Sequence, residues 1–384
     1  MNRRVIASFA LIAATLVASR VLAAPLYTIT DLPAFDGPVN GRFIQSYGFG
    51  INASGQITGS AGGDMFNHAF VYDGTMHDLG TLGGLQSTGL GINASGQVTG
   101  VSDSFTAGNL AKHAFFYDGT MHDIDTGGLF GYSAGLGINA SGQITGESAS
   151  SWQPDRHAFF YDGAMHDIGT LGGQTSSGRG INASGQITGN STLMPNSSLL
   201  HAFFYDGAMH DIGTLGGSSS EGNGINDRGQ ITGSSSTSAG LVHAFFYDGT
   251  MHDIGSLGGS RSEGFAINSS GQIVGDSTLA SNDSLYQAFV YDNLHGMRDL
   301  NSLIDPLLIN QFGGWGLETA YGINDRGQIA GSGVYRGNPT AFLLTPVPEP
   351  SSVILVALGV MGLLGYVSSA RRRAGIASRC DEAR

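Results

Sequence analysis

Histidine and aspartate are the residues of this sequence whose spacing could do chemistry. Ten of the eleven histidines recur at two positions nine residues apart, and an aspartate follows the second position each time. The two sets are His68, His113, His157, His201 and His243, and His77, His122, His166, His210 and His252. Imidazoles and carboxylates bind Zn²⁺ and also act as general acids and bases. Two hypotheses follow, a metal site and a catalytic site.

The metal hypothesis depends on which side chains share a face. If Asp73 and Gly74 form a two-residue hairpin turn, His68 and His77 lie on one face, about 7 to 8 Å apart at the backbone, and Asp78 lies on the other. A Zn²⁺ site needs a third and usually a fourth ligand on the same face. We therefore expect half-buried imidazoles bonded to neighbouring strands, with no bound metal. A metal-binding surface protein is the alternative.

The catalytic hypothesis lacks a unique site. We find no G-x-S-x-G elbow, H-E-x-x-H motif, EF-hand loop or P-loop. The aspartates recur in register, whereas catalysis generally needs one distinct site; they are Asp78, Asp123, Asp167, Asp211, Asp253 and Asp299. The sequence thus predicts no enzyme and no cofactor. An enzyme that acts on extracellular polysaccharide through a carboxylate pair is the alternative.

These residues belong to a unit that occurs seven times. Each copy reads approximately G-I-N-x-x-G-Q-I-T-G, a variable connection, and H-A-F-F-Y-D-G-x-M-H-D-I-G-T-L-G-G. The asparagine of the unit recurs at Asn52, Asn93, Asn139, Asn182, Asn226, Asn268 and Asn324, with spacings of 41, 46, 43, 44, 42 and 56 residues. A period of about 40 to 50 residues is typical of a β-propeller blade.

One copy predicts four antiparallel strands. In the first copy these are residues 47–51, 56–59, 68–72 and 75–82, with turns at Asn52–Gly55 and Asp73–Gly74. The seventh copy has no fourth segment, but the N-terminal residues Tyr27–Leu32 resemble one. We therefore predict an all-β fold, a seven-bladed β-propeller over residues 24–345 closed by this N-terminal outer strand. The alternative is an open solenoid.

The repeats resemble the HAF extracellular-repeat family. The similarity rests on H-A-F-V-Y-D-G-T-M-H-D-L-G-T-L-G-G at residues 68–84 and G-I-N-A-S-G-Q-I-T-G at residues 50–59, and covers most of residues 27–344. This sequence departs from the family where Tyr72 and its equivalents replace a frequent tryptophan, and where Gln287 and Thr340 replace the first histidine. The resemblance implies an exported repeat protein and supplies no known reaction.

Candidate ligand-binding residues lie in the variable connections. Both short turns of each repeat fall at one end of the fold, so the longer connections gather at the other, where a rigid scaffold usually binds its ligands. The candidates are Trp152, Arg156, Tyr286, Trp315, Tyr335 and Arg336. Their aromatic rings could stack on sugar rings. Alternatively, the two tryptophans cap the hydrophobic ends of blades.

Charge and cysteine content restrict the partners. Residues 24–350 contain 28 acidic and nine basic residues, a net charge of −19. Such a surface repels nucleic acid and anionic lipid, so we expect neither as a partner. The only cysteine, Cys380, follows the last basic cluster, and the exported part can form no disulfide.

The two ends of the sequence indicate export. Residues 1–23 have the basic start, apolar run and small-residue site of a secretory signal peptide, with a retained anchor as the alternative. Pro348, Glu349 and Pro350 in the motif of residues 346–350 precede an uncharged stretch, residues 351–370, long enough to span a bilayer as a helix. Arg371, Arg372 and Arg373 open a basic tail, residues 371–384, expected to stay cytoplasmic.

This C-terminal arrangement resembles the PEP-CTERM sorting signal of Gram-negative bacteria. The resemblance implies recognition by an exosortase, removal of the helix, and release to the cell surface or an exopolysaccharide matrix; a permanent single-pass anchor is the alternative. We therefore expect a non-catalytic binding or structural module for extracellular polysaccharide or a neighbouring surface protein.

Overall fold

The computed structural model describes residues 26–32, 34–35, 45–63, 66–106, 109–125, 131–149, 155–309 and 314–347. Residues 1–345 form one compact unit and residues 346–384 a second, and the account below concerns the first. The described residues form an all-β fold, to which one short 3₁₀ helix, η2 (Leu300–Leu303), is added. The expected all-β class is therefore confirmed.

The strands follow the repeats of the sequence. The first three repeats form β2 (Gln45–Ile51), β3 (Ile57–Gly63), β4 (Phe66–Tyr72) and β5 (Met76–Asp78); β6 (Gly83–Ile92), β7 (Val98–Thr106), β8 (Asn109–Tyr117) and β9 (Met121–Asp123); and β10 (Tyr132–Ile138), β11 (Ile144–Ala149), β12 (His157–Tyr161) and β13 (Met165–Asp167).

The next three repeats form β14 (Ser176–Ile181), β15 (Ile187–Thr192), β16 (Leu200–Tyr205) and β17 (Met209–Asp211); β18 (Gly216–Ile225), β19 (Ile231–Thr237), β20 (Val242–Tyr247) and β21 (Met251–Asp253); and β22 (Gly258–Ile267), β23 (Ile273–Leu279), β24 (Asn282–Asp292) and β25 (Gly296–Asp299). The seventh repeat forms β26 (Trp315–Ile323), β27 (Ile329–Tyr335) and β28 (Asn338–Pro346).

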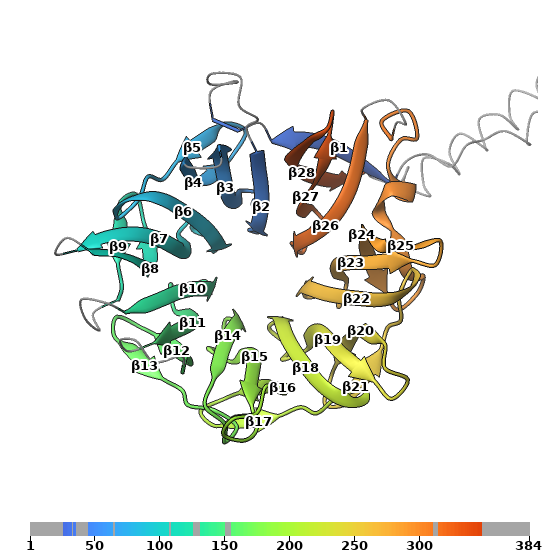
Figure 1. Ribbon diagram of the computed structural model, residues 1–384. Coiled ribbons are helices and arrows are strands. Elements are labelled where there is room, and N and C mark those ends of the chain that lie inside the picture. Colours follow the sequence, from blue (N-terminus) through green and yellow to red (C-terminus); the bar gives the residue numbers. More distant parts are fainter. Residues whose placement is uncertain are drawn as a thin grey trace, which may run out of the picture. The chain divides into compact units, whose positions relative to one another are not determined.

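Each repeat pairs its strands in chain order, and Figure 1 shows the sheets around a common centre with the first strand of each repeat innermost. The fifth and sixth sheets are linked by a single parallel pair, Val242 and Arg261. The seventh sheet takes its fourth strand from the N-terminus, β1 (Tyr27–Leu32), which lies next to β28. The Thr28 hydroxyl donates to the Thr345 carbonyl oxygen at 3.3 Å.

The first turn of every repeat is organised by its asparagine. The Asn52 Oδ1 accepts hydrogen bonds from the backbone N–H of Ser54 at 3.1 Å and of Gln56 at 2.9 Å. Gly55 has φ +90°, a conformation that favours glycine. The predicted turn at Asn52–Gly55 is therefore confirmed, and its asparagine is buried.

The same asparagines link neighbouring repeats. The Asn52 Nδ2 donates to the carbonyl oxygen of Asn93, the equivalent residue of the next repeat, at 3.0 Å. This bond occurs seven times, and the last one joins Asn324 to Asn52 at 2.9 Å. The others run from Asn93 to Asn139, Asn139 to Asn182, Asn182 to Asn226, Asn226 to Asn268 and Asn268 to Asn324. Each repeat is thus bonded to both of its neighbours.

The hydrophobic core contains one fully buried phenylalanine from the third strand of each repeat: Phe70, Phe115, Phe159, Phe203, Phe245, Phe289 and Phe342. In the first repeat the ring lies against Gly59. A Cβ at Gly59 would lie 1.8 Å from the Tyr47 carbonyl oxygen and 2.9 Å from the Phe70 ring, so only glycine fits. Close packing of this kind tolerates little change in volume.

The third and fourth strands pair one residue away from the predicted register. Tyr72 is opposite Met76 and Phe70 is opposite Asp78, so the turn spans the three residues 73–75. The fourth strand is also shorter than predicted, three residues instead of eight. A shift of one residue exchanges the faces of a strand. The predicted grouping of His68 with His77 is therefore wrong, as shown below.

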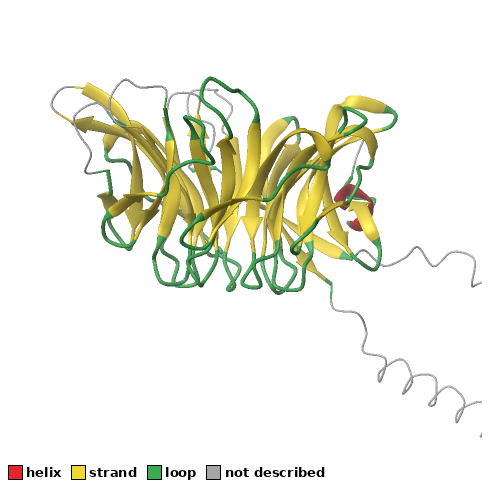
Figure 2. Cartoon of the chain, turned by 90° about the horizontal axis from the view of Figure 1, so that it is seen from below, coloured by secondary structure: helices red, strands yellow, loops and turns green. Residues whose placement is uncertain are grey.

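The connections divide between two ends, which Figure 2 shows along the two edges of the strands. Because the strands alternate in direction, the turns between first and second and between third and fourth strands share one end, here named the tight-turn end. The remaining connections form the loop end. The expected signal peptide and the expected helix at 351–370 lie outside the described residues. Within the described ranges, no helix is long and apolar enough to cross a membrane.

Candidate functional site

The first set of histidines pairs with the aspartates that follow the second set. The His68 Nδ1 lies 2.9 Å from Asp78 Oδ2. The equivalent pairs are His113–Asp123, His157–Asp167, His201–Asp211 and His243–Asp253, at 2.7 to 2.9 Å. Because the turn is one residue longer than predicted, Asp78 shares a face with His68, and the predicted placement on opposite faces is wrong.

The second set of histidines lies on the other face and pairs with the aspartate of the turn. The His77 Nε2 lies 3.0 Å from Asp73 Oδ1, and the hydrogen bond from His77 holds the pKa of this carboxyl below its usual value. In the sixth repeat Arg298 stands at the histidine position, and its Nη2 lies 2.9 Å from Asp292 Oδ2. This position therefore makes a contact with the turn aspartate that arginine can also make.

Each of these histidines contacts one aspartate. Among the residues described here, no group of three His, Cys, Asp or Glu side chains is placed to hold a metal ion. The same two kinds of histidine–aspartate contact therefore recur in the first five repeats.

The candidate residues at the loop end have different surroundings. Trp152 lies outside the described residues. The Arg156 Nη1 donates to Glu147 Oε1 at 2.7 Å, and its guanidinium lies 4.1 Å from the centre of the Tyr132 ring. Arg156 is exposed to solvent, and its guanidinium is held by Glu147 and by the ring of Tyr132.

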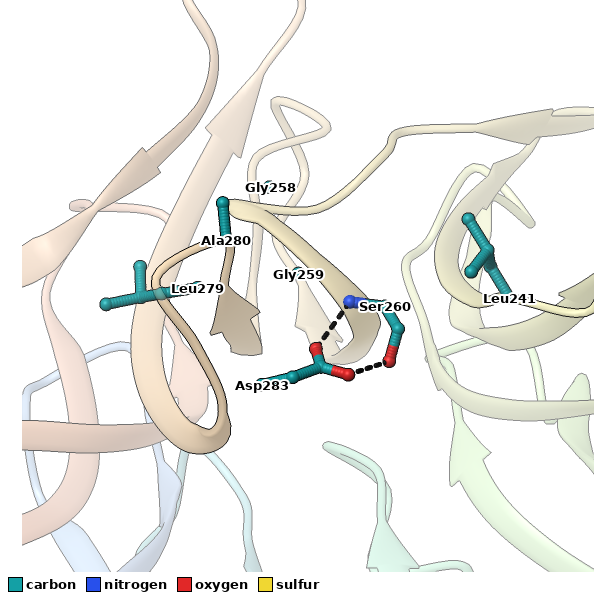
Figure 3. A pocket seen from close by; sticks show the side chains of 7 residues that line it. All are labelled: Leu241, Gly258, Gly259, Ser260, Leu279, Ala280 and Asp283. Atoms are coloured by element: carbon teal, nitrogen blue, oxygen red, sulfur yellow. Dashed lines mark hydrogen bonds between the residues drawn. The ribbon is translucent and has the colours of Figure 1, made fainter.

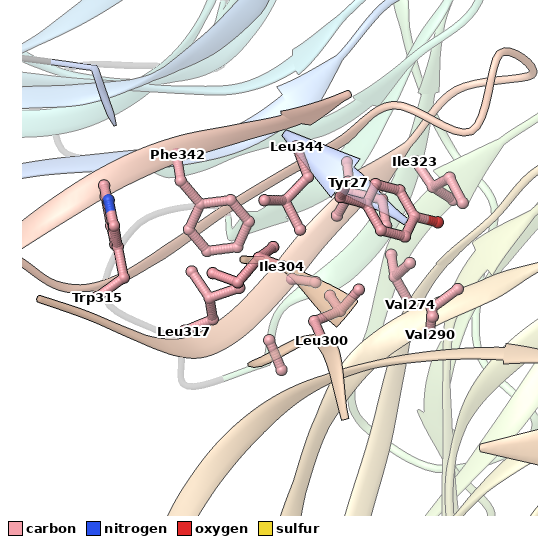
Figure 4. Packing of buried hydrophobic residues seen from close by; sticks show 13 residues of the cluster. Tyr27, Val274, Val290, Leu300, Ile304, Trp315, Leu317, Ile323, Phe342 and Leu344 are labelled. Carbon is pink, nitrogen blue, oxygen red and sulfur yellow. The ribbon is translucent and has the colours of Figure 1, made fainter. Parts of the chain in front are cut away.

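Trp315 differs from the expectation of an exposed aromatic anchor. It begins strand β26 and is only 5% exposed. Its ring stacks on Tyr335 at 4.9 Å and meets Phe342 edge-on at 6.1 Å. Figure 4 shows it within a cluster that includes Leu317 and Ile304. Trp315 therefore takes the packing role that was the alternative in the sequence analysis.

Tyr335 and Arg336 extend this cluster towards solvent. Tyr335 is half-buried, and the guanidinium of Arg336 lies 5.0 Å from the centre of its ring. Arg336 is exposed and has φ 52°, which is unusual for a residue other than glycine. The structure thus brings Trp315, Tyr335 and Arg336 together, whereas Arg156 belongs to the third repeat.

Tyr286 is exposed in β24, in the part of the chain that also lines a pocket of about 320 Å³ between the fifth and sixth repeats. Figure 3 shows its lining residues: Leu241, Gly258, Gly259, Ser260, Leu279, Ala280 and Asp283. The Asp283 carboxylate accepts hydrogen bonds from the Ser260 hydroxyl, from the Ser260 backbone N–H and from the Thr278 hydroxyl, and these bonds lower its pKa. This carboxylate of β24 therefore links Ser260 of β22 and Thr278 of β23 at the pocket.

The loop end gathers most of the large apolar side chains that the described residues expose. Ten of the twelve lie in or beside its connections: Phe66, Leu85, Phe105, Met194, Leu199, Leu241, Leu285, Tyr286, Leu307 and Leu308. Leu294 is the exposed leucine of the tight-turn end. A rigid scaffold usually binds its ligands at such variable connections. The loop end is therefore the candidate binding surface.

A second group of non-repeated residues lies on the first and second strands of the fourth to seventh repeats and was missed by the sequence analysis. The Arg179 Nη2 donates to Glu221 Oε2 at 2.9 Å, and the Asn223 Nδ2 donates to Glu263 Oε1 at 3.1 Å. The Thr319 hydroxyl donates to Asp276 Oδ2 at 3.2 Å. These contacts join the fourth to seventh repeats in succession.

One carboxyl of this group has a strongly shifted pKa. Partial burial raises the pKa of Asp276 to about 7, with a further contribution from Glu263, which is directly opposite it on β22. An alignment of the seven repeats on their asparagines would have pointed to the members of this group on the first strands. Three and five positions before the asparagine, the residue types change from repeat to repeat, while glycine or alanine persists beside them.

Comparison with known proteins identifies the C-terminal region. The PEP-CTERM protein-sorting motif matches residues 346–373. The match contains the predicted sorting residues Pro348, Glu349, Pro350 and Arg371 to Arg373. All six lie outside the described residues. It implies export, a C-terminal membrane anchor before processing, and recognition by an exosortase. No curated protein matches the sequence significantly.

The solved structures that match this chain are distant in sequence. TolB from Acinetobacter baumannii is 14% identical over 56% of this chain and 54% of its own, with a TM-score of 0.37. The β-propeller domain of the Trilobed protease from Pyrococcus furiosus is 14% identical over 67% of this chain and 84% of its own, with a TM-score of 0.46. The described residues thus form an all-β fold, and the sorting motif implies that the protein is exported.

Proposed function

We propose that the seven repeats form a closed ring of seven four-stranded blades. Two observations support this arrangement: the pairing of β1 with β28, and the asparagine bond from Asn324 back to Asn52. A closed ring leaves only short sheet edges and gives the loop end a fixed geometry.

We further propose that this ring is a non-catalytic binding module of the cell surface or extracellular matrix. An exosortase recognises the sorting motif, and the module reaches the surface after the membrane anchor is removed. The ligand is an extracellular polysaccharide or a neighbouring surface protein. The loop end is the binding surface, with Trp152, Arg156, Tyr286 and Arg336 as contact residues and with Trp315 and Tyr335 as their support.

The observation that carries this proposal is the distribution of exposed apolar side chains. They gather at the loop end, where the connections vary, while the repeated polar residues are engaged in contacts within the protein. The strong negative charge of the repeats disfavours polyanions, so a neutral polymer is preferred.

The test is co-sedimentation of the purified full chain with the insoluble exopolysaccharide of its host, with dextran beads as the matrix control. The loop-end variant Leu285→Ser/Tyr286→Ser is compared with Leu294→Ser, which removes the exposed leucine of the tight-turn end. We expect the first to weaken binding by about tenfold, because burial of each apolar side chain contributes roughly 1 kcal/mol or more. The control should bind like the unaltered protein.

Equal losses in both variants would refute the loop end as the binding surface. Release of shortened oligosaccharides during the incubation would replace the binding module with a polysaccharide-degrading enzyme.

A further inference from the structure

The first strand of every repeat, the innermost one in Figure 1, contains a β-bulge at the same place. In the first repeat the pairing of β2 with β3 passes from Gly48 to Gly50, so Phe49 has no partner in the ladder. The same irregularity occurs three residues before the asparagine in all seven repeats. Bulges redirect a side chain out of the ladder and are frequent next to active sites.

The residues at the bulge differ between repeats although their neighbours recur. Each one stands between two glycines, or between a glycine and an alanine. In repeat order the seven bulge residues are Phe49, Leu90, Leu136, Arg179, Asn223, Phe265 and Tyr321. Asn223 is buried and the other six are half-buried, so these six keep part of their surface accessible. A position outside both the ladder and the fully buried core is suited to contact a ligand.

Bulge residues of successive repeats lie next to each other. The centre of the Tyr321 ring is 5.1 Å from that of Phe49 and 5.3 Å from that of Phe265. The Arg179 Nη1 donates to Asn223 Oδ1 at 3.2 Å. Three aromatic rings from the sixth, seventh and first repeats therefore form one group, and two polar side chains from the fourth and fifth repeats form another.

Glycine after the bulge allows neighbouring repeats to approach closely. A Cβ at Gly137 would lie 2.9 Å from the Arg179 carbonyl oxygen, and a Cβ at Gly224 would lie 2.9 Å from the Phe265 carbonyl oxygen. At these distances a carbonyl group would have to move to admit any other residue. The third bulge is therefore packed against the fourth, and the fifth against the sixth, by backbone contacts.

The charges beside the two polar bulge residues are balanced. The Arg179 Nη2 lies 2.9 Å from Glu221 Oε2, and the Arg261 Nη2 lies 2.9 Å from Glu263 Oε2. Asn223 is uncharged and donates to Glu263 at 3.1 Å. Paired charges attract an ion weakly, but guanidinium, amide and carboxylate groups still offer hydrogen-bond donors and acceptors. A neutral ligand with many hydroxyl groups suits this chemistry.

We propose that the bulge residues form a binding site for a neutral sugar. A sugar ring has an apolar face of C–H groups and a rim of hydroxyl groups. The aromatic rings of Phe265, Tyr321 and Phe49 pack against the face, and Arg179 with its partner Glu221 bonds to the hydroxyl groups. Small-molecule sites in general combine a mostly apolar lining with a few polar groups.

This site is separate from the loop end. The bulge lies three residues before the asparagine that begins the tight turn, so it belongs to the part of the first strand nearest the tight-turn end. None of the ten exposed apolar residues of the loop end is a bulge residue. Binding of a sugar at the bulges therefore does not depend on the function proposed for the loop end.

The experiment is frontal affinity chromatography of oligosaccharides over the immobilised full chain, with mass spectrometry of the eluate. The probe is the uncharged fraction from partial acid hydrolysis of the host exopolysaccharide, and the acidic fraction is run beside it. We expect the neutral oligosaccharides to be retained and the acidic ones to pass, because the repeats are strongly acidic. Stronger retention of the acidic fraction would overturn the proposal.

Two variants test the two parts of the site with leucine, which already occupies the bulge in the second and third repeats. Phe49→Leu/Phe265→Leu removes two aromatic faces and should weaken retention about tenfold. Arg179→Leu removes a hydrogen-bonding group and should weaken it about fivefold. The matched control is Phe105→Leu, the same substitution at an exposed loop-end position, which should be retained like the unaltered protein.

The outcomes separate this site from the loop end. Loss of retention in Phe105→Leu without loss in Phe49→Leu/Phe265→Leu would assign the sugar to the loop end and overturn the proposal, as would no retention by the unaltered protein. Co-sedimentation with the intact polymer tests the loop end separately. Its failure, with oligosaccharides still retained through the bulges, would remove the loop-end proposal and leave this site standing.

Discussion

The tight-turn end and the loop end are made by the same repeats, but they differ in how far their residues recur from copy to copy. At the tight-turn end, the asparagines and the turn aspartates occur in nearly every copy, and their side chains are bonded within the protein. At the loop end, lengths and residue types vary, and apolar side chains face solvent. Repetition at one end therefore supplies stability, which leaves the other end free to vary without loss of the fold.

The largest effect should come from removing the strand that connects the two chain ends. Deletion of residues 24–32 from the full chain exposes the edge of β28 and removes the buried side chains of Tyr27 and Leu32. We expect the melting temperature to fall by about 10 °C, because each of these side chains contributes about 2 to 3 kcal/mol. Differential scanning calorimetry would measure it, and an unchanged melt would contradict the role of β1 in completing the seventh sheet.

A smaller loss should follow when one tight turn is broken. Asn182→Ala removes three bonds within its own turn and one to the Asn226 carbonyl oxygen of the next repeat. Leaving such buried groups without partners costs about 2 kcal/mol. Urea unfolding should show this, with the exposed loop-end variant Ser238→Ala as the control. If both variants were equally stable, the tight turns would not carry the stability that we assign to them.

The histidine–aspartate pairs of the tight-turn end should give a pH-dependent effect smaller than that of the asparagine. The pKa values of Asp73, Asp118, Asp162, Asp206 and Asp248 are lowered by hydrogen bonds from their histidines. Lowered carboxyl pKa values stabilise the fold above about pH 4, and this stability is lost as pH falls through the folded value.

Replacement of the five partner histidines by glutamine should therefore lower the melting temperature slightly at pH 6, and the difference should disappear below about pH 3. Melting curves across this range would measure it. A difference that persisted in strong acid would show that the histidines act through packing instead.

The smallest change in stability is expected at the loop end. Met194→Ser/Leu199→Ser alters two exposed side chains and should shift the free energy of unfolding by no more than about 0.5 kcal/mol. The same variant should bind the exopolysaccharide less strongly. Destabilisation as large as that of Asn182→Ala would remove the distinction between the two ends.

Local patterns predicted most of the fold. The turn at Asn52–Gly55 and the strand Tyr27–Leu32 follow from short sequence signals, and the structure contains both. The turn after Tyr72 was predicted one residue too short. Asp-Gly favours a two-residue hairpin turn, but the Asp73 backbone N–H bonds to the Thr75 carbonyl oxygen at 3.2 Å, and repeats with alanine in place of Thr75 make the same three-residue turn. That single residue placed each histidine on the wrong face.

The candidate site was less predictable because its properties depend on distant residues. Trp315 was judged from its place in a long connection, but Tyr335 and Phe342 bury it. The pKa of Asp276 depends on Glu263 in an adjacent strand and on Thr319 from the next repeat. A repeat considered alone contains none of these partners.

The pairing of β1 with β28 also sets an order of events during synthesis. Thr28 and Thr345, which are hydrogen-bonded, are separated by 317 positions. Strand β1 is therefore synthesised long before β28, the strand with which it pairs. Until residue 346 has crossed the membrane, β1 has no partner and its apolar residues are available to other chains. Completion of the seventh sheet therefore marks the end of export, when the sorting segment that follows β28 has also been delivered.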